Sequence, residues 1–195
     1  MISNTINLPD TPIIREAITI VKAAVSDNIF HHSMRTYYLG TLYAEKEKLK
    51  IEKEELLLSA LFHDTGFFSP YQSKGKPFQI GSSLALKDFL WKEKKFPPHR
   101  INAMMEAIDF HFQLKPRWDK GEVAGILQIG AHMDVIGKNS HKIDKEKHRE
   151  ILTLHPKNFF FLEFNHCLFK SLSSIPSLVG LFFPEKYFGS NHYIS

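Results

Sequence analysis

The chain has 195 residues, 43% of them hydrophobic, and a formal net charge of +4. This length favours a single domain over residues 1–195, and the apolar content is enough for a sizeable core. The small positive charge is not the dense basic pattern of a nucleic-acid-binding protein, because many lysines alternate with acids. Cys167 is alone, which rules out an intrachain disulfide and indicates a reducing compartment.

The hydrophobic segments carry no targeting or membrane signal. Residues 1–10 have neither a basic start nor a long apolar run, so we expect no signal peptide. The longest uncharged part of the apolar C-terminal region, residues 171–184, has 14 residues and is too short to cross a bilayer as a helix. We therefore expect a cytoplasmic protein with neither a membrane nor a nucleic-acid partner.

Apolar residues recur with helical spacing along almost the whole chain, which predicts an all-α fold. The first helix is expected at Thr11-Pro12, where a capping hydroxyl precedes a proline, and a later helix at Asp144, a good N-cap. Gly66 is expected to end the third helix. In chain order, the predicted helices cover residues 12–25, 32–49, 52–64, 82–95, 99–111, 121–136, 144 onward and 157–173.

The segment 66–81, between the third and fourth predicted helices, is rich in Phe, Pro, Gly and Lys. It directly follows a histidine and an aspartate, so we expect it to form the wall or lid of any site there. Phe67, Phe68 and Phe78 are candidates for lining an apolar pocket. Ordinary core packing is the alternative for these three aromatic residues.

The pair His63-Asp64 follows an apolar helical run and has ligand-type side chains in a position where packing does not require them. His32 opens the second predicted helix, and Asp134 lies late in the sixth. Two neutral imidazoles and two carboxylates would balance a divalent cation, and these ligands without thiolate suit Zn²⁺, Fe²⁺ or Mn²⁺. We therefore expect all four residues to bind one metal ion, although a lone His-Asp pair is common by chance.

Three stretches together resemble the HD-domain superfamily of metal-dependent enzymes. They are His-Ser-Met-Arg-Thr-Tyr at residues 32–37, the run ending in Phe-His-Asp-Thr-Gly at 57–66, and Asp-Val-Ile-Gly at 134–137. Within the superfamily the chain looks most like the cyanamide hydratase branch, which has a similar Ala-Ile-x-x-His element at residues 107–111. The similarity covers about residues 28–170, and it implies an HD-domain-like helical bundle.

The resemblance also implies that His32, His63, Asp64 and Asp134 hold the metal. The chain departs from the pattern of the branch in one element. Residues 78–81, Phe-Gln-Ile-Gly, lack the acidic side chains of the branch's loop, and one residue is missing. This departure bears on the identity of the substrate more than on metal binding.

Two further residues are candidates for catalysis. The resemblance favours His111 as a proton shuttle or a further ligand, whereas a helix-end histidine that bonds to the backbone is the ordinary alternative. Arg35 shares a helix face with His32 and is expected either to pair with a site carboxylate or to hold a polar substrate. His31 and His132 are expected to point elsewhere, His132 because it lies two residues before Asp134.

Three functions remain open at this point. The first is hydration of a small nitrile-like molecule such as cyanamide by metal-activated water. The second is hydrolysis of a nucleotide or another phosphate ester, the commonest chemistry of the superfamily, which usually needs Arg or Lys clamps. The third is a non-catalytic metal- or ligand-binding module. Thr65-Gly66 follows the His-Asp pair where many phosphohydrolases carry a lysine, which favours the nitrile, whereas Lys74 and Lys76 weaken that preference.

The expected partner is therefore a small-molecule substrate, with a second copy of the chain as a further candidate. The apolar segments 159–162 and 181–183 would suit a homodimer interface, because they are more apolar than one small core requires. An ordinary buried helix explains these segments as well.

Overall fold

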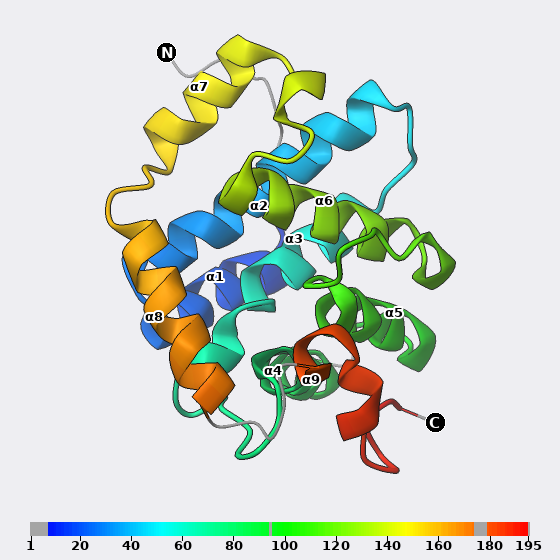
Figure 1. Ribbon diagram of the computed structural model, residues 1–195. Coiled ribbons are helices and arrows are strands. Elements are labelled where there is room, and N and C mark those ends of the chain that lie inside the picture. Colours follow the sequence, from blue (N-terminus) through cyan, green and yellow to red (C-terminus); the bar gives the residue numbers. More distant parts are fainter. Residues whose placement is uncertain (1–7, 94, 174–178, 195) are drawn as a thin grey trace.

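The computed structural model describes residues 8–93, 95–173 and 179–194, and every regular element in these ranges is a helix (Figure 1). The predicted all-α class is therefore confirmed. The long helices are α1 (Pro12–Ala24), α2 (Asp27–Lys46), α3 (Lys53–Phe62), α4 (Phe78–Glu93), α5 (Pro98–Phe110), α6 (Glu122–Ile136), α7 (Lys145–Leu154) and α8 (Phe160–Ser173). Shorter pieces are α9 (Val179–Phe182) and the 3-10 turns η1 (Thr65–Phe67), η2 (Trp118–Lys120), η3 (Ser140–Lys142) and η4 (Pro184–Tyr187). Residues 1–7 and 174–178, which the signal-peptide and membrane-span predictions include, lie outside the described residues.

The helix starts follow local capping chemistry. Thr11 accepts a hydrogen bond from the backbone N–H of Ile14 at the start of α1, and Asp144 accepts two at the start of α7, both as predicted. The second helix begins earlier than we predicted, because the Ser26 side chain caps it. His32 therefore lies inside α2 and not at its opening, where the surrounding helices can bury it.

The chain around Gly66 also differs from the prediction. Helix α3 ends at Phe62, so His63 is its C-cap and Asp64 lies beyond it, in the turn that leads into η1. Gly66 does not have a left-handed backbone. Its role is close approach, because a Cβ there would clash with the carbonyl oxygen of Phe78. Helix α4 starts at Phe78, and residues 78–81 are its first turn and not a loop.

Helices α2 and α6 form the centre of the bundle and pack closely against each other (Figure 1). Their contact is between backbones: a Cβ on Gly130 of α6 would clash with the carbonyl oxygen of Thr36 on α2, and one on Gly40 would press on Ile126. Because α2 is enclosed in this way, nearly all of its residues from Ile29 to Ala44 are buried. Polar side chains on this helix are therefore held in fixed positions.

A smaller apolar cluster joins the C-terminal helices to the bundle. Its buried members come from five elements and are Ile29, Phe67, Phe78, Phe160, Phe164 and Leu181. Phe67 and Phe78 stack on each other with ring centroids 3.9 Å apart, so they are core residues, the alternative we left open. Phe160 is buried while its neighbours Phe159, Phe161 and Leu162 are more than half exposed. The homodimer stays a prediction, and no helix among the described residues is both long and apolar enough to span a bilayer.

We expect Gly130→Ala to lower the free energy of unfolding by about 1–3 kcal/mol, because the new methyl group forces α2 and α6 apart. Gly189→Ala is the matched control, since a Cβ at this position meets no other atom. Urea unfolding followed by circular dichroism measures both. Equal midpoints for the two variants would contradict the close approach of α2 and α6.

Candidate metal centre

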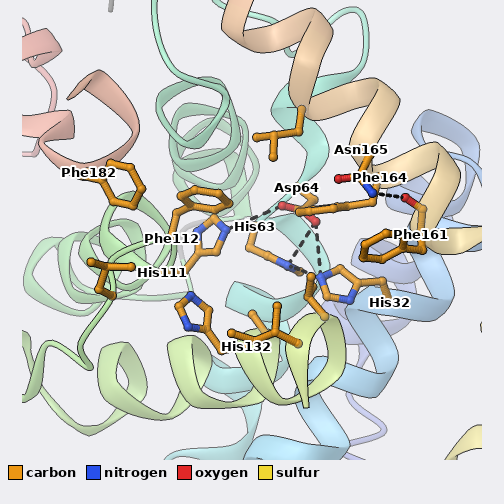
Figure 2. A pocket seen from close by; sticks show the side chains of 15 residues that line it. His32, His63, Asp64, His111, Phe112, His132, Phe161, Phe164, Asn165 and Phe182 are labelled. Carbon is orange, nitrogen blue, oxygen red and sulfur yellow. Dashed lines mark hydrogen bonds and ion pairs between the residues drawn. The ribbon is translucent and has the colours of Figure 1, made fainter. Parts of the chain in front are cut away.

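Three of the four predicted ligands converge on one buried point. His32 from α2, His63 at the end of α3 and the adjacent Asp64 each offer a ligand atom, and these atoms lie within 4.8 Å of one another. The Nε2 atoms of His32 and His63 are 3.2 Å apart, and Asp64 Oδ2 lies 3.5 Å and 3.3 Å from them, respectively. Figure 2 shows the three side chains pointing toward one another.

Hydrogen bonds on the far side of each ring fix its tautomer. His63 Nδ1 donates to the carbonyl oxygen of Ala60 at 2.7 Å, and His32 Nδ1 donates to Asp134 Oδ2 at 2.6 Å. With each proton on Nδ1, both Nε2 atoms present lone pairs to the same point. This is how metal-binding histidines are usually oriented in proteins, with the other ring N–H donated to a carbonyl or carboxylate.

Asp64 supports the same interpretation from the acceptor side. Both of its carboxylate oxygens are buried and have no hydrogen-bond partner among the described residues. A buried carboxylate in this condition is costly, and burial raises its pKa. The Nε2 lone pairs of His32 and His63 face the same point as this carboxylate. That arrangement is unfavourable by itself and favourable around a divalent cation, so the residues present fit a metal ion.

Asp134 lies beside this group but at the Nδ1 edge of the His32 ring, away from Nε2. Its two oxygens accept hydrogen bonds from Arg35 Nε and Nη2 at 2.8 and 2.9 Å, and Lys157 Nζ is 3.1 Å from Oδ1. Burial opposes its ionisation, but the hydrogen bonds and charges of His32 and Arg35 prevail and hold the pKa of Asp134 below its usual range. Asp134 orients His32 in this arrangement, and its role as a direct ligand stays a prediction.

Arg35 has the first of its two expected contacts, the ion pair with a site carboxylate. Its remaining donor, Nη1, bonds to the carbonyl oxygens of His155 and Pro156 at 3.1 and 2.9 Å. The guanidinium is fully buried and is not part of the cavity wall. Contact between Arg35 and a substrate therefore stays a prediction that this geometry does not favour.

His111 completes the polar end of the site. As the C-cap of α5 it donates Nδ1–H to the carbonyl oxygen of Ile108 at 2.6 Å, the backbone bond we considered, yet its Nε2 lies 3.7 Å from Asp64 Oδ1. Burial, together with neighbouring His63, lowers the pKa of His111 to about 3. Burial, together with His32, likewise lowers that of His63 to about 3. Without a metal both rings are neutral near pH 7, with Nε2 as an acceptor.

A cavity of about 360 Å³ opens from these residues toward solvent. Its walls are mostly apolar and come from α6, α8, α9 and the segment after α5 (Figure 2). Segment 66–81 is not among the lining residues, so its expected role as the wall is wrong, while its role as a lid stays a prediction. Phe67, Phe68 and Phe78 do not line the cavity. Besides the metal group and His111, the lining residues are Phe112, Leu114, Ala131, His132, Val135, Ile136, Phe161, Phe164, Asn165, Leu168 and Phe182.

His132 and Asn165 are polar lining residues that the sequence did not predict. We expected His132 to face away from the site because it lies two residues before Asp134 on one helix. Asp134, however, points at His32 and is not among the lining residues, whereas Ala131, His132, Val135 and Ile136 of α6 are. Burial lowers the pKa of His132 to about 4, and Gln128 Nε2 lies 3.0 Å from its Nδ1. No local sequence signal distinguishes this position from a surface histidine.

The buried histidines predict an acid-sensitive metal-free protein. The pKa of His111 is about 3 in the folded state and 6.5 in the unfolded state, so between these values only the unfolded state binds the proton. Stability is therefore lost as the pH falls below about 6.5, by up to about 1.4 kcal/mol per pH unit for this histidine. In chelator-treated protein, His111→Asn should make the measured slope shallower by about this amount.

The control for this measurement is His99→Asn, an exposed histidine on the same helix. Its slope of unfolding free energy against pH should match that of the wild type. Identical slopes for the His111 and His99 variants would show that His111 titrates normally in the folded protein.

Comparison with known proteins agrees with this geometry. Residues 29–118 match the family model of the HD domain, and this range contains His32, His63, Asp64 and His111 but ends before Asp134. The comparison with curated proteins gives no significant match. HD domains are all-α and are generally metal-dependent hydrolases, and the His-His-Asp group lies within the matched residues. The match therefore supports placing this chain in the HD-domain superfamily.

Proposed function

We propose that the protein is a metal-dependent enzyme that activates water for attack on a small, uncharged, nitrile-like substrate. The observation that carries the proposal is the unpartnered, buried carboxylate of Asp64, which faces two imidazole lone pairs at the inner end of the cavity. His32, His63 and Asp64 would hold a Zn²⁺, Fe²⁺ or Mn²⁺ ion, with Asp134 either orienting His32 or joining them. When bound, such an ion lowers the pKa of a coordinated water molecule and polarises the substrate.

The protein's own side chains supply the proton transfers. His111 keeps one proton on Nδ1 through its bond to Ile108, so its Nε2 is free to take a proton and return it. This Nε2 lies beside Asp64 and lines the cavity, which places it within reach of a bound water molecule or substrate nitrogen. Hydration of a nitrile needs such a transfer, because the nitrogen gains a proton as the carbon gains oxygen.

The charge of the cavity favours an uncharged substrate over a phosphate ester. No lysine or arginine is among the described residues that line it, and Arg35 is committed to Asp134 and to two backbone carbonyl groups. Lys74 and Lys76, which we had counted in favour of a phosphate, are not part of the lining. Phosphate recognition relies on charge-assisted hydrogen bonds that this wall does not offer.

Phosphohydrolysis is the second candidate, and the HD-domain match is the observation that favours it. A non-catalytic metal-binding module is the third. The cyanamide hydratase-like assignment derives support from the motifs around His32, His63 and His111. The segment 78–81, which departs from the branch, forms the first turn of α4, where Phe78 lies in the core rather than in the cavity.

Asp64→Ala tests the metal site and the reaction together. We expect the purified variant to lose its bound metal by elemental analysis and to turn over neither nitriles nor phosphate esters, while its circular dichroism stays helical. Asp88→Ala on α4, away from the cavity lining, is the control and should retain metal. Full metal content in Asp64→Ala would contradict the ligand assignment, and wild-type turnover of phosphate esters without nitriles would favour the second candidate.

His111→Ala should lower kcat by about 10²–10⁴-fold, the usual contribution of a general acid–base residue, while the metal content stays close to that of the wild type. His99→Ala, an exposed change on the same helix, should leave kcat unaltered. A normal kcat in the His111 variant would remove this residue from the mechanism. Loss of metal in the same variant would instead assign His111 as a further ligand.

A further inference from the structure

We infer that the substrate of this site carries an uncharged apolar body of about aromatic size, which occupies the outer part of the cavity while its reactive group lies at His63 and Asp64. This inference rests on the proposed function for the reactive group. It goes beyond it by assigning the substrate class, an aryl or alkyl nitrile rather than cyanamide itself.

The size of the cavity is the first reason. A molecule of three heavy atoms such as cyanamide fills roughly the space of two water molecules, about 60 Å³. The cavity measures about 360 Å³. This volume falls in the range of sites that enclose whole organic ligands, about 300–1,000 Å³. Cyanamide would leave most of the space beside the reactive end unfilled.

The chemistry of the wall is the second reason. Phe112, Val135, Phe164, Leu168 and Phe182 surround the space outside the metal group, and His132 and Asn165 add only isolated polar contacts. Water in such a space makes few hydrogen bonds, so an apolar group that replaces it gains free energy. A charged body would lose its hydration without finding a partner.

The mouth of the cavity continues the same surface. Leu114, Ile136 and Phe161 line the cavity and are still 70%, 66% and 61% exposed, respectively. These side chains belong to three separate segments, so the apolar rim is not a property of one helix. A substrate with an apolar body would therefore meet apolar side chains at the exposed rim as well as deeper in the cavity.

Helix α8 allows this to be tested with matched variants. Leu168 lines the cavity, whereas Leu162 on the same helix is 70% exposed and does not. Leu168→Trp would fill the outer cavity, and Leu162→Trp makes the same change outside it. We would measure calorimetric binding and kcat/KM with phenylacetonitrile, cyanamide and benzyl phosphate as probes, using metal-containing protein.

We expect the wild-type kcat/KM for phenylacetonitrile to exceed that for cyanamide by at least about 100-fold, since several buried carbon atoms contribute. Leu168→Trp should lower this ratio and weaken phenylacetonitrile binding by at least about tenfold, and Leu162→Trp should leave both at wild-type values. If Leu168→Trp does not fold, Phe161→Ser at the exposed mouth replaces it, with Phe159→Ser, 73% exposed and outside the lining, as its control.

The outcomes separate this inference from the proposed function. Hydration of cyanamide with neither binding nor turnover of phenylacetonitrile would overturn the apolar body and leave the function standing. Binding of phenylacetonitrile that Leu168→Trp weakens, without turnover of any nitrile, would support the apolar body and overturn the proposed chemistry. Tighter binding of benzyl phosphate than of phenylacetonitrile would overturn the requirement for an uncharged substrate.

Discussion

The site depends on a buried series of side-chain hydrogen bonds that runs from Arg35 through Asp134 to His32. Asp134 stays ionised in the core because the planar guanidinium of Arg35 donates to both of its oxygens, the geometry that best compensates a buried carboxylate. The ionised carboxylate in turn holds the proton of His32 on Nδ1. The Nε2 lone pair of His32 therefore points toward the end of α3, where His63 lies.

At that point the protein keeps an arrangement that is unfavourable by itself. The facing imidazole nitrogens and the Asp64 carboxylate, which has no hydrogen-bond partner among the described residues, lie buried at the inner end of the cavity. Helix α2, which carries His32, packs closely against α6 at Gly40 and Gly130, and this packing holds the His32 side chain in place. A buried carboxylate without a hydrogen-bond partner is costly in a core, and a bound cation would compensate this cost.

The cavity adds selectivity to this reactive end. Outside the metal group, its polar side chains are those of His111, His132 and Asn165, while Arg35 is withheld from the cavity by its bonds to Asp134 and the backbone. The same Arg35 that stabilises the site is therefore removed from substrate recognition. The described lining offers an anionic substrate no lysine or arginine, whereas an apolar molecule finds complementary walls.

The sequence by itself determined the helical class and most helix positions, and it predicted His32, His63, Asp64 and His111 as site residues. These follow from local rules: apolar spacing predicts helices, Thr11 and Asp144 cap them, and His63-Asp64 breaks an apolar run. Tertiary structure alone decided that Asp134 faces Arg35 and the Nδ1 side of His32. It also decided that His132, Phe161 and Phe164 line the cavity in place of Phe67 and Phe78. The direction of these side chains depends on contacts between segments about 100 residues apart, such as His32 with Asp134, which no local pattern encodes.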